Sequence, residues 1–85
     1  MVKFSETALE NFTYWIGEDK KIALKILKLI EEIQRDYFKG IGKPEPLKGD
    51  FKGYWSRRIT DEHRLIYKID EGQLFIHSCR FHYTK

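Results

Sequence analysis

Hydrophobic residues in the first forty positions recur at the spacing of two helices. The first helix is predicted over residues 5–17, with Ser5 as its N-cap and Gly17 as its end. Its apolar positions are Ala8, Leu9, Phe12, Trp15 and Ile16. The second is predicted over residues 19–40, with Gly40 as its end and a lysine-rich face opposite one apolar stripe. That stripe consists of Ile22, Ile26, Leu29, Ile30, Ile33 and Tyr37.

After Gly53 the apolar period shortens from the helical value to the alternation of strands. Strands are predicted over residues 54–60, 63–69 and 73–81, joined by tight turns and therefore arranged as an antiparallel meander. Residues 2–4 are a candidate brief edge strand, and residues 41–53, rich in glycine and proline, are predicted to be loop. The pattern indicates an α+β fold in which a helical hairpin packs on one face of an antiparallel sheet.

Composition places the chain among small globular proteins. Its 85 residues, 41% of them hydrophobic and without repeats or linkers, predict one domain spanning residues 1–85. The single cysteine, Cys79, excludes an internal disulfide framework and fits a reducing compartment. The sequence has no apolar run of membrane-spanning length and no signal-peptide core, so a cytoplasmic location is predicted.

Charge adds a preference for nucleic acid. The formal net charge is +3, and basic residues outnumber acidic ones between positions 39 and 68. The cations there are interleaved with Tyr54, Trp55 and Tyr67. Positive charge beside aromatic rings suits single-stranded RNA, whose phosphates attract cations and whose unstacked bases pack on rings.

One carboxylate in the predicted loop stands out by its setting. Glu45 lies between Pro44 and Pro46, and prolines on both sides restrict the backbone to extended conformations. Lys48 follows three residues later, and two arginines, Arg57 and Arg58, lie on the next predicted strand. A rigid acid near cations suits phosphate chemistry, although a stiff surface loop with a solvated charge explains these residues equally well.

The other acid–base candidates are Glu62, His63, His77 and His82. His77 lies within a strand and is interpreted as structural, whereas His63 opens a strand beside a turn. His82 lies at the chain end, followed by Tyr83, which can orient a substrate. A zinc site at His77, Cys79 and His82 is disfavoured, because strand alternation separates the ligands and only three are present. No cofactor motif is present in the sequence. One carboxylate, one terminal histidine and several cations suit metal-free RNA cleavage through the 2′-hydroxyl.

Four separated segments resemble the Txe/YoeB family of bacterial toxins, within the RelE superfamily. They are residues 42–48 (GKPEPLK), 54–59 (YWSRRI), 62–67 (EHRLIY) and 79–83 (CRFHY). The resemblance implies a microbial-ribonuclease-like α+β fold and a ribosome-dependent endonuclease that cleaves mRNA in the ribosomal A site and inhibits translation. It also implies neutralisation by a cognate antitoxin and a tendency to form a homodimer.

Carried over by position, the resemblance assigns a role to six residues. Glu45 is the implied general base, His82 the implied general acid, and Arg64 the implied stabiliser of the transition state. The residues implied to bind phosphate and to orient the substrate are Lys48, Arg58 and Tyr83. The chain departs from the family pattern in its extension by Thr84 and Lys85, and in Leu9, where many members have tryptophan.

Two other functions stay open at this point. One is a non-enzymatic toxin of the ParE kind, which poisons gyrase by binding; this hypothesis leaves Glu45 and His82 without a role. The other is a small basic module that binds RNA or the ribosome without chemistry. Loss of Glu45 and His82 would leave the activity of such a module intact, whereas loss of its lysines and arginines would abolish it.

Overall fold

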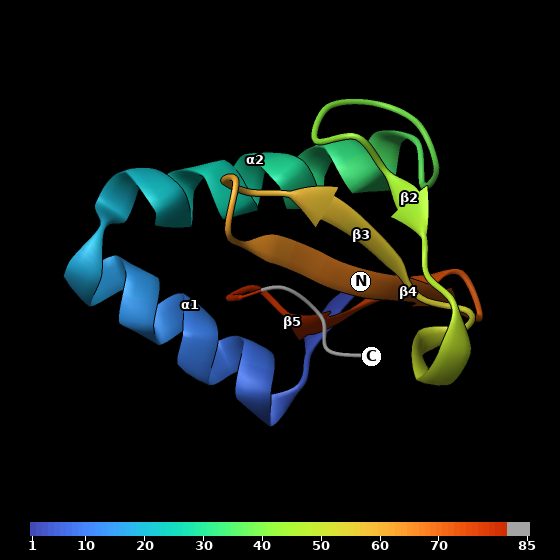
Figure 1. Ribbon diagram of the computed structural model, residues 1–85, viewed down its shortest axis with the longest axis horizontal. Helices are drawn as coiled ribbons and strands as arrows, with labels where there is room; N and C mark the ends of the chain where they lie inside the picture. Colours follow the sequence, from blue (N-terminus) through green and yellow to red (C-terminus); the bar gives the residue numbers. More distant parts are fainter. Residues whose placement is uncertain (82–85) are drawn as a thin grey trace.

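The computed structural model describes residues 1–81, in which two helices pack on one face of a five-stranded sheet (Figure 1). The α+β prediction is confirmed. In chain order the elements are β1 (Val2–Phe4), α1 (Glu6–Glu18), α2 (Lys20–Arg35), β2 (Glu45–Pro46), a 3-10 helix (Gly49–Phe51), β3 (Trp55–Arg58), β4 (Arg64–Asp70) and β5 (Gln73–Ser78).

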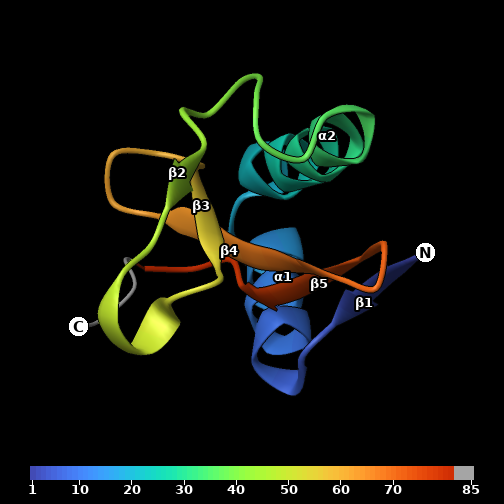
Figure 2. The same ribbon diagram turned by 90° about the vertical axis from the view of Figure 1, so that its right-hand side faces the viewer.

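The sheet has the order β1-β5-β4-β3-β2, with β1 and β2 at its two edges (Figure 2). Strands β3, β4 and β5 form the predicted antiparallel meander; β3 and β5 are shorter than predicted, and β4 has the predicted length but is shifted by one residue. The sheet is mixed, because the edge strand β1 runs parallel to β5. Strand β2 was predicted to be loop, and two residues are too few to show a period. Its Pro46 is tolerated because β2 is an edge strand.

Both helices begin where the sequence indicated. Ser5 caps α1, since its Oγ accepts a hydrogen bond from the Ala8 N–H. Gly17 was wrongly predicted to end α1; the helix continues to Glu18, because Asp19 provides the break. The extended Asp19 closes α1 through its N–H and caps α2 through its carboxylate. No helix in the described part of the chain is both long and apolar enough to cross a membrane.

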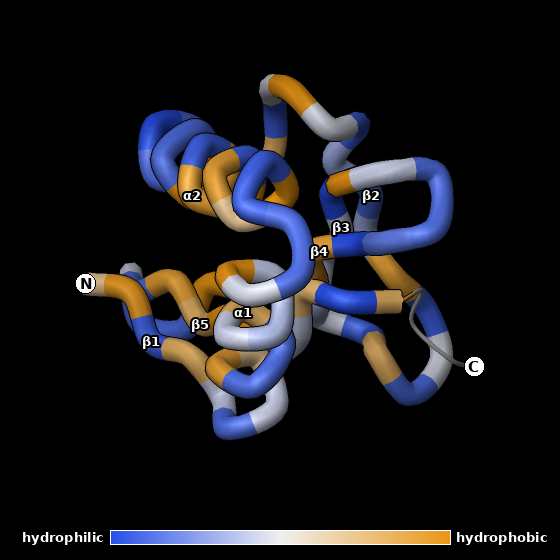
Figure 3. Tube along the Cα trace, turned by 90° about the vertical axis from the view of Figure 1, so that its left-hand side faces the viewer, coloured by the Kyte–Doolittle hydropathy of each residue, from blue (hydrophilic) through white to orange (hydrophobic). Residues whose placement is uncertain are grey.

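The core lies between the helices and the sheet. Most of the predicted stripe of α2 is buried there, and Figure 3 shows the hydrophobic side of α2 turned inward. On α1 only part of the predicted apolar set is buried: Leu9 and Ile16 are about half exposed, on the solvent side. The fully buried members of the core are Ala8, Ile26, Leu29, Ile33, Ile59, Leu65, Tyr67, Ile76 and Cys79.

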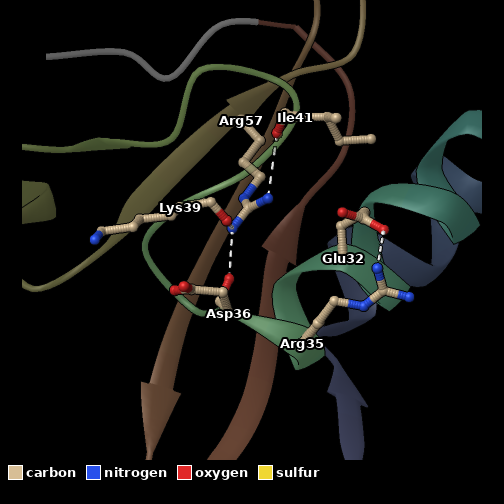
Figure 4. Close-up of polar contacts among 6 residues, drawn as sticks. All are labelled: Glu32, Arg35, Asp36, Lys39, Ile41 and Arg57. Atoms are coloured by element: carbon tan, nitrogen blue, oxygen red, sulfur yellow. Dashed lines mark hydrogen bonds and ion pairs between the residues drawn. The ribbon is translucent and has the colours of Figure 1, made fainter.

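The guanidinium of Arg57 is also fully buried, at the junction between α2 and the sheet. Helix α2 ends at Arg35, not at Gly40, and the chain that follows wraps around this charge (Figure 4). Arg57 donates to the carbonyls of Asp36, Lys39 and Ile41, at 2.8, 3.0 and 3.2 Å. Residues 36–40, which were predicted to be the end of α2, therefore form part of a loop whose carbonyls point toward the buried cation.

A phenol completes the surroundings of Arg57. The Tyr67 hydroxyl accepts from the Arg57 Nε at 3.2 Å and donates to the Tyr37 carbonyl at 2.8 Å. Burial raises the pKa of Tyr67, and its hydrogen bond with Arg57 opposes this shift. The phenol therefore stays protonated at neutral pH and can serve as donor and acceptor at once.

Two glycines allow the loop to approach Arg57 closely. Gly40 and Gly42 have φ values of +126° and +85°, which favour glycine. A Cβ on Gly40 would lie 3.0 Å from the Arg57 Nη1, and one on Gly42 would lie 3.1 Å from the Arg57 Cβ. The Gly42 carbonyl also accepts from the Arg58 N–H at 2.6 Å, which extends the pairing of the sheet. The loop is thus shaped to fit around Arg57.

The buried guanidinium leads to a stability prediction. Arg57→Met removes the donor from three carbonyls, and each buried group left unsatisfied costs about 1–3 kcal/mol. We expect the free energy of unfolding, measured by urea denaturation with tryptophan fluorescence, to fall by about 3 kcal/mol or more. The neighbouring Arg58 is exposed, so Arg58→Met should change it by only about 0.5 kcal/mol. Equal effects of the two substitutions would contradict the role given to Arg57.

The buried thiol leads to a second prediction. Burial raises the pKa of Cys79 to about 12, so almost no thiolate exists at pH 8. Ellman's reagent should therefore react at least about a hundredfold more slowly with the folded protein than with the chain unfolded in urea. Cys79 is the only cysteine, so the signal has one source. Similar rates in the two states would show that Cys79 is accessible.

Candidate active site

The register of the sheet brings three of the predicted site residues to one face. Glu45 pairs with Ser56, and Arg58 pairs with Arg64 two positions along. Opposed residues and residues two apart in a strand point to the same side of a sheet. The opposite side carries Leu65 and other core residues that pack against the helices. Glu45, Arg58 and Arg64 therefore share the face turned away from the helices, called here the outer face.

Glu45 is held on this face by its neighbours in the chain. It lies in β2, where it pairs with Ser56, and the next N–H, that of Leu47, donates to the Tyr54 carbonyl at 3.0 Å. Leu47 is buried whereas Glu45 is exposed. Within residues 1–81 no basic side chain comes within 4 Å of the Glu45 carboxylate. A fixed backbone and an unpaired carboxylate suit a group that takes up a proton from a ligand.

Arg64 lies at the start of β4, beside the turn that follows β3. Its Nη1 donates to the carbonyls of Thr60, Asp61 and His63, at 2.8, 3.1 and 3.1 Å. These three bonds fix the orientation of the Arg64 guanidinium beside the turn. A guanidinium has five N–H donors, and its free donors can make charge-assisted bonds to an anion.

The other predicted cations, Lys48 and Arg57, do not lie beside Arg58 and Arg64 on the strands of the outer face. Lys48 is exposed at the start of the 3-10 helix, in the segment that follows β2 rather than on a strand. Arg57, grouped with Arg58 as a cation near Glu45, is buried on the opposite side of the sheet and is unavailable to a ligand. The sequence does contain a sign that Arg57 is buried. Arg57 alternates with Trp55 and Ile59, which are hydrophobic and lie on the same side of the chain.

His77 has the structural environment that the sequence analysis expected. Its ring makes edge contacts with Phe51 and Tyr54, at centroid distances of 5.3 and 5.4 Å. It is the extra residue of a β-bulge, because Ile66 pairs with Ser78 while the next residue of β4 pairs with Ile76. This aromatic cluster was not predicted, because it joins residues 51–54 to β5, which lies far away in the sequence.

The described residues contain no group of three or more His, Cys, Asp or Glu side chains that could hold a metal ion. Cys79, one of the three ligands considered, is fully buried in the core. Its Sγ lies 3.6 Å from the Ala8 carbonyl, which is the setting of a small buried hydrophobe. His82 and Tyr83, the predicted general acid and substrate-orienting residue, lie outside the described residues.

Cys79 and Phe81, which precede His82 in the sequence, are held by hydrogen bonds to distant parts of the chain. After β5 ends at Ser78, the N–H and the carbonyl of Cys79 are bonded by side chains of α1, Asn11 and Trp15. The N–H of Phe81, the last described residue, donates to His63 at 2.7 Å. His63 lies beside the turn before β4, as predicted, but its contact with the C-terminal segment was not predicted.

The chain is similar to a family of known proteins over nearly its whole length. Residues 4–83 match the family model of the YoeB-like toxin of the bacterial type II toxin-antitoxin system. Toxin RelK of Mycobacterium tuberculosis is 52% identical over 82 residues, which cover 96% of each chain.

Two solved structures from Staphylococcus aureus share the fold. A heterotetrameric YoeB-YefM toxin-antitoxin complex contains a chain 45% identical to this one, with a TM-score of 0.91, covering 98% of this chain and 97% of that one. A YoeB dimer has 46% identity and a TM-score of 0.89, covering 96% and 95%. Since the family model spans nearly the whole sequence and the M. tuberculosis relative is about half identical, this chain belongs to the YoeB toxin family of bacterial type II toxin-antitoxin systems.

Proposed function

We propose that this protein is a ribosome-dependent endoribonuclease that cleaves mRNA in the ribosomal A site and so inhibits translation. The observation that carries the proposal is the common outer face of Glu45, Arg58 and Arg64. One carboxylate and two guanidiniums on one side of a sheet combine a proton acceptor with two anion ligands. Membership of the YoeB family supports the same activity.

In the proposed reaction the nucleophile comes from the substrate. Glu45 takes the proton of the 2′-hydroxyl, and the 2′-oxygen attacks the adjacent phosphorus. The bond from phosphorus to the 5′-oxygen breaks, and His82 gives a proton to that oxygen. The products are a 2′,3′-cyclic phosphate and a free 5′-hydroxyl. The two protein groups end with exchanged protonation states and return to their starting states by exchange with solvent.

The cations act on the charge that builds up on the phosphate. Arg64 is the proposed ligand of the transition state, because its guanidinium is already fixed by the turn carbonyls. Arg58, opposite it on β3, and the exposed Lys48 would bind flanking phosphates. Tyr83 would orient the substrate beside His82. Pre-positioned charge is effective in catalysis because no reorganisation is needed during the reaction.

The first test removes the proposed base. Glu45→Gln should lower kcat for cleavage on ribosomes programmed with mRNA by about a hundredfold or more, the usual contribution of a general base, with KM nearly unchanged. Glu62→Gln, which alters an exposed acid in the turn before β4, is the matched control and should cleave like the wild type. End-group analysis of the wild-type products should find the cyclic phosphate and the 5′-hydroxyl.

The outcomes separate the competing functions. Wild-type cleavage by a folded Glu45→Gln protein would show that Glu45 is not the base. A wild-type protein that binds ribosomes without cutting mRNA would indicate a binding module, and one that inhibits gyrase would indicate a toxin of the ParE kind.

The proposed partner is an antitoxin, since a YoeB relative from S. aureus forms a complex with YefM. A second copy of the chain is another proposed partner, since a YoeB dimer is known from S. aureus. The cationic outer face favours an acidic, largely disordered antitoxin segment that folds on binding.

Hydrogen exchange of the toxin–antitoxin complex tests this site of inhibition. Bound antitoxin should protect the backbone amide of Glu45 and those of the turn between β3 and β4, before Arg64, and should abolish cleavage. Protection confined to the exposed lysines of α2, Lys21, Lys25 and Lys28, would contradict a contact at the outer face.

A further inference from the structure

The polar backbone groups of Cys79 and Phe81 are bonded by groups from distant parts of the chain. The Cys79 N–H donates to the Asn11 Oδ1 at 3.0 Å, and its carbonyl accepts from the Trp15 Nε1 at 2.9 Å. The Phe81 N–H donates to the His63 Nδ1 at 2.7 Å, and its carbonyl accepts from the Arg64 N–H at 3.0 Å. Strand pairing bonds the backbone of this segment up to Ser78. Beyond Ser78, side chains of α1 and residues at the start of β4 bond it instead.

Phe81 has a backbone conformation that needs such support. Its φ of +66° lies in the left-handed region, which is uncommon for residues with a large side chain. Conformations of this kind persist where surrounding bonds over-determine them, and they concentrate at functional sites. Two bonds from consecutive residues, His63 and Arg64, hold the N–H and the carbonyl of Phe81.

The imidazole of His63 is itself oriented by neighbouring rings. It makes an edge contact with the buried Trp15, with centroids 4.8 Å apart, and a tilted contact with Phe81, at 5.7 Å. For the Nδ1 to accept the Phe81 N–H, the imidazole must carry its proton on Nε2. The ring contacts fix where the Nδ1 points, and the Nδ1 fixes the Phe81 amide.

We propose that His63 is a positioning residue for the reaction. By accepting the Phe81 N–H it holds Phe81 in its left-handed conformation, and so sets the direction in which the chain enters His82, the next residue. This inference rests on the proposed function, in which His82 is the general acid. Loss of the acceptor lets Phe81 relax to an ordinary conformation. A displacement of the acid by about 1 Å is enough to reduce catalysis strongly.

A pair of variants separates the acceptor from the ring. His63→Asn and His63→Leu both remove the imidazole and have similar shapes, but only asparagine places an oxygen near the position of Nδ1. We expect His63→Leu to lower kcat for A-site cleavage by about tenfold to a hundredfold with KM within about twofold of the wild type. His63→Asn should recover at least about tenfold of that loss.

A second measurement follows the hydrogen bond directly. In His63→Leu the amide proton of Phe81 should move upfield in the NMR spectrum and exchange faster with solvent, and in His63→Asn it should return toward the wild-type values. Should His63→Leu fail to fold, His63→Phe, which keeps an aromatic ring against Trp15 and lacks an acceptor, takes its place in both measurements.

The result that overturns the inference differs from the one that overturns the function. Equal kcat values for the Leu and Asn variants, or an unchanged Phe81 amide in both, would exclude a positioning role for the Nδ1 acceptor. In the same assay, a wild-type protein that cleaves and a Glu45→Gln protein that does not would leave the proposed function standing. A wild-type protein that does not cleave would instead refute the function itself.

Discussion

The buried charge of Arg57 constrains more of this structure than any other single group. A guanidinium cannot be removed from water unless its N–H groups find acceptors, and among the described residues these are backbone carbonyls and a phenol. The chain after α2 must therefore leave the helix and curve around the charge, which Gly40 and Gly42 permit. The loop then pairs with Arg58 and enters β2. The position of Glu45 on the outer face therefore depends on the burial of Arg57 on the opposite face of the sheet.

A second set of contacts controls the other end of the chain in a comparable way. Asn11 and Trp15 bond the backbone of Cys79, and His63 and Arg64 bond that of Phe81. In both places a short segment without regular structure is held by groups from distant elements. The sheet supplies the arginines, and these two segments lead to the proposed base in β2 and to the proposed acid. A stable sheet can in this way support a site whose parts come from its irregular edges.

The sequence predicted those parts of the fold that repeat. The stripe of α2 and the alternation in β4 extend over enough residues to reveal their period, and the helical hairpin and the meander followed from them. Strand β2 is too short to show a period, and the end of α2 was missed because a buried arginine, not a glycine, determines it. Arg57 was grouped with Arg58 among the cations near Glu45, and its burial was missed because the acceptors that allow it lie far away in the sequence.

The site was predicted in a different manner. The setting of Glu45 between two prolines was visible in the sequence, but its roles and those of Arg58 and Arg64 came from a family resemblance. Only the strand register places the three side chains on one face. The contact of His63 with Phe81 had no sequence signature, since it is a bond from a side chain to a distant backbone amide. The catalytic and binding roles of all six residues, Glu45, Lys48, Arg58, Arg64, His82 and Tyr83, stay predictions.

A modified mRNA can show whether the substrate's own 2′-oxygen is the nucleophile. A single 2′-deoxynucleotide is placed immediately upstream of the scissile phosphate in the A-site codon, and cleavage by the wild-type protein is followed on programmed ribosomes. A message with the deoxynucleotide one position downstream is the control. We expect cleavage at that phosphate to be abolished in the first message and unchanged in the second. Undiminished cleavage of the first message would show that the 2′-oxygen is not the nucleophile.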